Sequence, residues 1–157
     1  MNGAEALKAL YALQEKDLEI DRLRAEAESL PEELVALQGQ VETLEERLTN
    51  LLERRAELER EYNRHSLDIE DLSAKEKQAE EEQKRAQSAR EQTQYENRIQ
   101  QIKDRIRELL ELSTPIMEAM ENLEAEIAQV EEELAALRPR LQELLEANRA
   151  RVAELEA

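Results

Sequence analysis

The chain has 157 residues and a net charge of −17, with 39% of its residues charged and no Cys, Phe or Trp. Such an acidic surface repels a phosphate backbone, which argues against nucleic-acid binding by the chain as a whole. The lack of Cys excludes disulfides and thiolate metal sites, and no apolar run approaches the ~20 residues of a membrane span. The N-terminus lacks the pattern of a signal peptide, so we expect a cytoplasmic protein without membrane contact.

Residues 1–29 are predicted to form a separate N-terminal helix. We expect it to end at Ser29-Leu30-Pro31-Glu32, a capping-box pattern with proline in the first turn of the next helix. The large apolar residues of the segment are Leu7, Leu10, Tyr11, Leu13, Leu18, Ile20 and Leu23. They form a stripe wider than a coiled-coil seam, which suits contact with more than one helix. Leu7, Leu10, Tyr11 and Leu18 are therefore candidate protein contacts.

Residues 30–84 are predicted to form the first arm of a coiled coil. Apolar residues recur at alternating steps of three and four, a heptad pattern that already begins at Ile20. Fourteen of the 16 seam positions are apolar, the full series being Ile20, Leu23, Ala27, Leu30, Leu34, Leu37, Val41, Leu44, Leu48, Leu51, Arg55, Leu58, Tyr62, His65, Ile69 and Leu72. A strict heptad repeat predicts left-handed supercoiling.

Residues 92–157 are predicted to form the second arm, after a tip at residues 85–91. Thirteen of its 14 seam positions are apolar, namely Ile99, Ile102, Ile106, Leu109, Ser113, Ile116, Met120, Leu123, Ile127, Val130, Leu134, Leu137, Leu141 and Leu144, with Ser113 the exception. The first series does not continue into the second, because the phase is reset by two residues between Ala79 and Tyr95. One continuous helix absorbs such a reset as a stutter, but an antiparallel hairpin explains more of the pattern.

The hairpin pairs seam positions whose residue numbers sum to 171, such as Leu72 with Ile99 and Leu48 with Leu123. A slide by one heptad preserves the pairing of a with d positions, so the pattern leaves the register open by that amount. Pro31 and Pro139 then lie at the same level, where we expect a kink because proline removes a helical hydrogen bond. Pro115 is expected to kink the second arm, with Ser113 and Thr114 close enough to help satisfy the freed backbone.

Three features are candidates for sites of chemistry. His65 is the only histidine, and a lone histidine in a seam, here opposite Ile106, fits a core position better than a metal or catalytic site. Arg55, opposite Ile116, fits a charge that sets the register and reaches a flanking carboxylate better than a hinge. Consecutive carboxylates at 80–82 diverge by roughly 100° each on a helix, so they predict a solvated face and not a cation site.

The tip carries a local group of cations. Lys84, Arg85 and Arg90 lie near Tyr95, which is the aromatic residue closest to the tip. These four residues are the candidate contacts for a partner or for nucleic acid.

Three stretches of the sequence resemble the N-terminal coiled-coil hairpin of the bacterial C4-type zinc-ribbon protein family. They are Leu7-x-x-Leu10-x-x-Leu13-Gln14-x-x-Asp17-x-x-Ile20-x-x-Leu23 followed by Leu30-Pro31, the tip from Ser88 to Ile99, and the acidic stretch from Leu109 to Leu123. The resemblance implies a kinked helical hairpin followed by a ribbon with two CxxC pairs that bind zinc. This chain contains no Cys, so no cofactor is expected in it. Relatives are implicated in regulating flagellar or secretion-system genes through protein partners or messenger RNA.

The sequence therefore predicts an all-α protein, a long kinked antiparallel two-helix coiled-coil hairpin with a separate N-terminal helix. A two-helix rod offers no cleft for catalysis, so we expect a non-enzymatic scaffold for protein–protein interaction, as a monomeric hairpin or a homodimer. The alternative is a nucleic-acid-binding regulator that uses the basic tip and a missing zinc ribbon. A third interpretation, a hairpin that enters the polymerase secondary channel, ranks low because such hairpins carry paired acids where this chain has Lys84-Arg85-Ala86-Gln87-Ser88.

Overall fold

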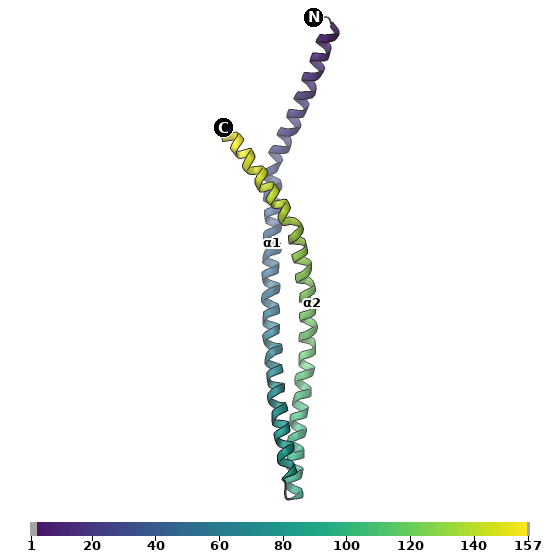
Figure 1. Ribbon diagram of the computed structural model, residues 1–157, viewed down its shortest axis with the longest axis vertical. Helices are drawn as coiled ribbons and strands as arrows, with labels where there is room; N and C mark the ends of the chain where they lie inside the picture. The colour runs from purple at the N-terminus through teal and green to yellow at the C-terminus, as the bar shows by residue number, and fades with distance from the viewer. Residues whose placement is uncertain (1–2, 157) are drawn as a thin grey trace. The chain divides into compact units, whose positions relative to one another are not determined.

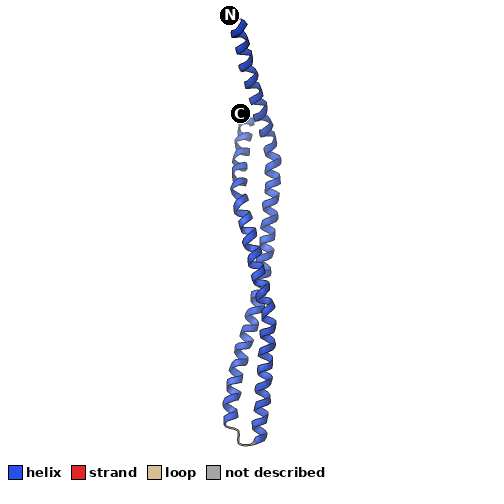
Figure 2. Cartoon of the chain, turned by 90° about the vertical axis from the view of Figure 1, so that its right-hand side faces the viewer, coloured by secondary structure: helices blue, strands red, loops and turns tan. Residues whose placement is uncertain are grey.

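Two long α-helices account for the fold. The computed structural model describes residues 3–156, without the side chain of Ala27. Helix α1 spans Gly3–Lys84 and α2 spans Ala89–Glu156, joined by residues 85–88 (Figure 1). Within residues 3–156 there is no strand (Figure 2). The expected all-α class and the two long helices of a hairpin are confirmed.

The connection between the helices is held by hydrogen bonds at both helix ends. The N–H groups of Arg85 and Ala86 donate to the carbonyls of Glu82 and Gln83 at 3.0 and 3.1 Å, which tightens the last turn of α1. At the start of α2, the Glu91 N–H donates to Ser88 Oγ at 3.1 Å and the Gln87 N–H donates to the Glu91 carboxylate at 3.2 Å. The pattern is that of a capping box, Ser-x-x-Glu, except that Glu91 accepts from the N–H of Gln87, one residue before the N-cap. It starts α2 at Ala89, earlier than the residue 92 expected for the second arm.

The described residues divide into two compact units. The tip unit is Arg47–Val130, and the end unit comprises the residues up to Glu46 together with those from Glu131 onwards. Each unit contains a segment of α1 and a segment of α2.

The tip unit buries one apolar stripe from each helix. Its buried apolar residues are Leu58, Ala79, Ile99, Ile102, Leu109, Ile116, Ile127 and Val130, and Leu109 is only 1% exposed. Ser113 is buried among them and satisfies its hydroxyl by donating to the Leu109 carbonyl at 2.8 Å. The stripe follows the spacing expected from the sequence, and its burial is what holds the two segments of this unit together.

The register of the tip unit corrects the pairing at a residue sum of 171. Ion pairs join Arg55 to Glu124 at 2.9 Å and Lys103 to Glu76 at 3.8 Å, and each pair has residue numbers that sum to 179. At ~1.5 Å per residue, a sum of 171 separates such partners by roughly 12 Å along the axis. A third pair, Arg47 with Glu126 at 3.8 Å, sums to 173. Taken together, the three pairs lie nearer a slide of one heptad, to a sum near 178, in which Leu72 lies at the level of Ile106 and not of Ile99.

The geometry of the turn explains why the register is shifted by one heptad from a sum of 171. Gln83 Nε2 donates to the carbonyl of Gln92 at 3.5 Å, so the end of α1 lies beside a residue one turn inside α2. The first turn of α2 thus lies beyond the end of α1. A hairpin centred on its loop midpoint, as the sum of 171 assumes, does not allow for this offset.

The end unit buries its own short stripe. Leu34, Val41, Leu134 and Leu144 are buried, and ion pairs join Arg138 to Glu45 at 3.5 Å and Arg140 to Glu33 at 3.8 Å. The residue sums of these two pairs lie on either side of 178, so the shifted register holds in this unit as well. The pair nearest the prolines, Arg140 with Glu33, has a sum of 173, close to the 170 of Pro31 and Pro139, so the level match expected for the two prolines stays a prediction.

The prediction of a separate N-terminal helix is wrong, because α1 continues through Pro31. Proline lacks a backbone N–H and so removes one hydrogen-bond donor from the helix, whereas the other residues of the neighbouring turns keep their backbone N–H donors. The hydroxyl of Ser29 donates to the Glu26 carbonyl at 2.9 Å, so Ser29 lies inside the helix and is not a cap. Near Pro115, Ser113 and Thr114 donate to the carbonyls of Leu109 and Leu110, and not to that of Glu111, which the proline leaves without its usual donor.

Candidate protein-interaction surface

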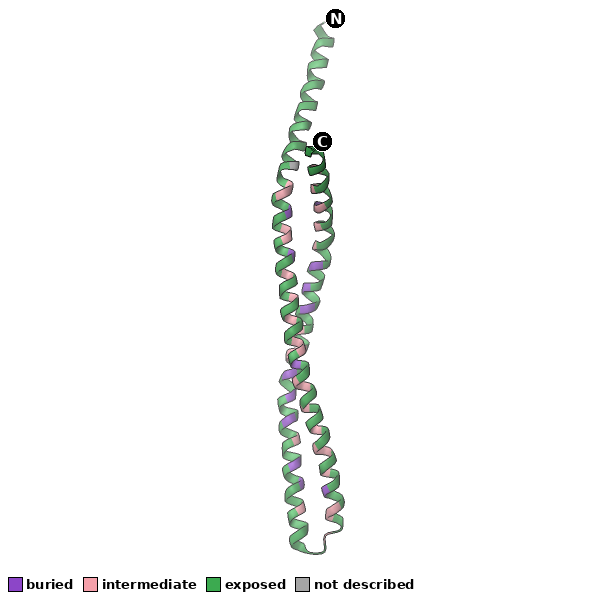
Figure 3. Ribbon diagram, turned by 90° about the vertical axis from the view of Figure 1, so that its left-hand side faces the viewer, coloured by how far each residue is buried: buried purple, intermediate pink, exposed green. Residues whose placement is uncertain are grey.

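The N-terminal part of α1 carries an apolar surface that no described residue covers. Every residue from Gly3 to Glu26 is exposed (Figure 3). The large apolar side chains among them are 47% (Ile20) to 70% (Leu18) exposed, and the full set is Leu7, Leu10, Tyr11, Leu13, Leu18, Ile20 and Leu23. We call this set the N-terminal apolar surface. A group of neighbouring exposed apolar side chains marks an interaction site, whereas single ones are ordinary.

The N-terminal apolar surface has two faces. Leu7, Tyr11 and Leu18 recur at steps of four and seven, so they lie on one face of the helix, with Leu10 at its edge. Leu13 and Ile20 lie on the next face, in line with the seam positions that α1 buries further along the chain. The four residues predicted from the sequence thus belong to the face that does not continue the buried seam.

The end of α2 does not cover this surface. Leu155 is 73% exposed and Val152 is 38% exposed, while Leu23, the seam position at the level of Leu155 in the shifted register, is 52% exposed. Side chains that packed against each other would lose most of that exposure. The apolar surface is therefore open on both of its faces.

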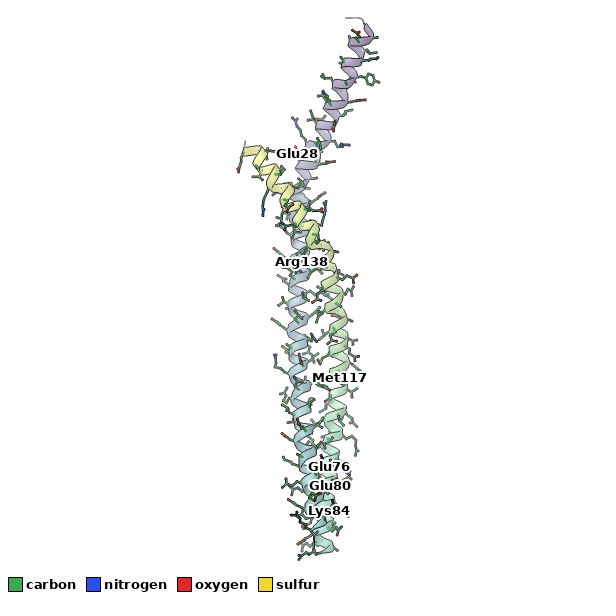
Figure 4. All side chains as sticks on the ribbon, in the orientation of Figure 1. Glu28, Glu76, Glu80, Lys84, Met117 and Arg138 are labelled. Atoms are coloured by element: carbon green, nitrogen blue, oxygen red, sulfur yellow. The ribbon has the colours of Figure 1, made fainter. Side chains whose placement is uncertain are left out.

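The tip is less basic than its cations suggest. Lys84 Nζ lies 3.3 Å from the Glu81 carboxylate, and the carboxylate of Glu91 caps the start of α2. Figure 4 labels Lys84 at the end of α1, with Glu80 one turn before it. Between residues 80 and 98 there are five carboxylates and four cations. Arg85 and Arg90 are exposed and Tyr95 is half-buried, so the predicted tip residues do not form a continuous positive patch.

The two polar seam residues of α1 lie where the sequence placed them, on the inner face. Arg55 donates to Glu124 at 2.9 Å, and its Nε is buried without a hydrogen-bond partner. His65 has a side chain 17% exposed, with Nε2 3.9 Å from Glu61 and Nδ1 buried without a partner. In the shifted register Ser113, and not Ile106, lies at the level of His65, and Leu123, and not Ile116, at that of Arg55.

Sequence reasoning missed a shallow groove in the tip unit. Tyr62, Met117 and Met120 line a hollow of about 220 Å³, with Glu121 and Glu124 at its edge. Met117 is an exposed residue next to the seam (Figure 4). Only the shifted register brings Tyr62 to the level of the two methionines, so the signal was present in the sequence but depended on the register.

No metal site is apparent in the part of the chain that the structure describes. No group of three His, Cys, Asp or Glu side chains is arranged to hold a metal ion among residues 3–156. The two CxxC pairs implied by the zinc-ribbon resemblance have no counterpart, since the sequence has no Cys. The residues therefore do not fit a zinc ribbon. Neither described helix has a segment long and apolar enough to cross a membrane.

The chain matches no protein-family model, no curated protein and no solved structure. Its function is therefore inferred from its own surface.

Proposed function

We propose that the protein is a non-enzymatic, cytoplasmic coiled-coil scaffold that mediates protein–protein interaction through the N-terminal apolar surface. One observation supports the proposal above all others, the group of seven large apolar side chains on α1 that are each about half or more exposed. Covering these side chains removes apolar area from water, which favours association at ~25 cal/mol per Å².

The proposal includes coiled-coil packing of the two helices. The heptad spacing, the buried stripes of both units and the flanking ion pairs all agree with such packing. A long continuous helix such as α1 holds its exposed side chains on fixed faces, as a scaffold requires.

Site-specific photo-crosslinking tests the proposal. A photoreactive residue at Leu18 in the full chain, expressed in its source cells, is expected to give a discrete crosslinked species of defined mass. The matched control is the same residue at Leu67, which is 61% exposed on the same helix but has no apolar neighbours of this kind. Leu10→Glu should abolish the species formed from position 18. Equal crosslinking from positions 18 and 67 would contradict the proposal.

A further inference from the structure

The face formed by Leu7, Tyr11 and Leu18 is self-complementary. We propose that it binds the same face of a second copy of this chain, antiparallel, in a weak and reversible dimer. The inference rests on the proposed function and adds the identity of one partner. Leu7, Tyr11 and Leu18 are exposed among the described residues, and the pattern around them indicates an occupant for their face.

The apolar positions match under a two-fold axis. Leu7, Tyr11, Gln14 and Leu18 follow steps of four, three and four, so Leu7 and Gln14 take d positions and Tyr11 and Leu18 take a positions. If residue numbers in the two copies sum to 25, Leu7 faces Leu18 of the second copy and Tyr11 faces its Gln14. Every a position then meets a d position, as antiparallel packing requires, and a two-fold axis makes each contact twice.

The charges beside the face also match. In this frame Lys8 and Glu15 are the e positions, and an antiparallel pair brings e positions of the two helices together. Lys8 of each copy therefore lies next to Glu15 of the other. Leu10, at a g position, lies beside the second copy's Asp17 and covers the apolar contact with its side chain.

A parallel dimer would leave these charges unmatched. Parallel helices bring a g position of one copy beside an e position of the other. Lys8 would then lie beside Gly3 of the second copy, and Glu15 beside its Leu10. Neither charge would have an oppositely charged neighbour across the contact, whereas the antiparallel pair matches both. A parallel pair would instead match Asp17, at a g position, with Arg22, at an e position, so the spin-label distances below decide the orientation.

The small size of the surface limits the affinity of the dimer. About four helical turns on each copy bury less area than the roughly 1,200 Å² at which stable specific interfaces begin. The acidic chains also repel one another, with a net charge of −17 on each. The dimer should consequently form only as concentration rises.

Sedimentation velocity of the full chain over a wide range of concentrations tests the proposal. The unmodified chain should shift from monomer towards dimer, whereas Leu18→Glu should remain monomeric. Leu67→Glu is the matched control and should dimerise like the unmodified chain, because Leu67 lies on the same helix outside this surface. Circular dichroism should show unchanged helix content in both variants, since both side chains are exposed.

Charge exchange tests the pairing of Lys8 with Glu15. Lys8→Glu and Glu15→Lys should each weaken dimerisation, and the double variant should regain it. Spin labels fix the orientation, because a label at Ala4 should lie about 25 Å from its copy in the antiparallel dimer but about 10 Å away in a parallel one. A label at Ala12, next to the two-fold axis, should lie about 10 Å from its copy.

Three outcomes would overturn the inference. They are a chain that stays monomeric at every concentration, equal loss of dimer in the Leu18 and Leu67 variants, and a short distance between labels at Ala4. The proposed function fails separately, since it depends on crosslinking from position 18 to any protein. If the chain is monomeric but crosslinks to a different protein from position 18, the dimer proposal is wrong and the scaffold proposal is supported.

Discussion

Arg55 and Glu124 lie 2.9 Å apart across the two helices of the tip unit, a contact that the shifted register allows and a residue sum of 171 does not. Both side chains are about half exposed, so the pair contributes at most ~1 kcal/mol to stability. Its value is geometric, because a slide of one heptad separates the two residues by roughly 10 Å. The apolar seam tolerates that slide, whereas the contact between Arg55 and Glu124 does not.

Engineered disulfides distinguish the two registers. The chain has no native Cys, so Arg55→Cys with Leu123→Cys should form a disulfide on mild oxidation. Arg55→Cys with Ile116→Cys should remain reduced, because those positions pair only at a sum of 171 and Cα atoms more than ~7 Å apart cannot be bridged. Mobility on a non-reducing gel reads out both pairs, and the reverse result would support the register with a sum of 171.

The heptad pattern was sufficient to predict two helices and the reversal between them, since each buried stripe follows it. It did not predict the register, because the spacing of seam residues such as Leu72 is the same after a slide of seven. The turn was predictable in principle from Ser88 and Glu91, which form a capping box although the stretch lacks Gly and Pro. The helix end predicted at Ser29 is wrong, because a serine hydroxyl can either cap a helix or donate to a carbonyl in the preceding turn. Ser29 does the second, and the sequence does not distinguish the two.

The candidate site was predictable only in part. The sequence shows that Leu7, Leu10, Tyr11 and Leu18 share a broad apolar stripe. Their exposure depends on which residues pack beside this part of α1, and the 73% exposure of Leu155 shows that this residue does not pack there. Exposure of these side chains depends on tertiary packing, which the spacing of apolar residues along one helix does not determine.

Arg55→Leu should raise the melting temperature by a few degrees. Leucine at this seam position gains about 1–2 kcal/mol from burial, removes a buried Nε that has no partner, and loses only an exposed ion pair. Arg54→Leu is the matched control and should give no rise, because Arg54 points outward with its side chain 60% exposed. Thermal unfolding followed by circular dichroism measures both, and a clear fall for Arg55→Leu would show that the position is not in the seam.

His65→Leu should also stabilise the tip unit, by about 1–2 kcal/mol. The buried Nδ1 makes no hydrogen bond, and an unsatisfied buried polar atom is costly. His65→Asn keeps a polar side chain at the same place and should give no such gain. Urea unfolding monitored by circular dichroism compares the two variants, and loss of stability in the leucine variant would indicate that His65 has a favourable partner in solution.

Ser88→Ala should weaken the start of α2. The Ser88 hydroxyl accepts from the Glu91 N–H, and loss of such a cap typically costs ~1 kcal/mol. Amide hydrogen exchange should accelerate at Glu91, whose N–H loses its acceptor, and at Gln92, whose N–H donates to the Ser88 carbonyl at 3.1 Å. Thr93→Ala is the control in the same turn, where the lost bond is an in-helix contact to the Ala89 carbonyl, and exchange there should stay close to that of the unmodified chain. Equal exchange in the two variants would mean that the capping box is not formed.

The tip should bind single-stranded RNA only weakly and with little dependence on salt. Its five carboxylates offset its four cations, and Lys84 is already paired with Glu81. A protein that neutralises several phosphates loses affinity steeply as salt rises, because counterions are released on binding. We therefore expect the unmodified chain and an Arg85→Ala/Arg90→Ala variant to give the same shallow slope in a gel-shift titration at several salt concentrations. A steep slope that the double variant removes would favour the nucleic-acid regulator over the scaffold, because only exposed Arg85 and Arg90 differ between the two proteins.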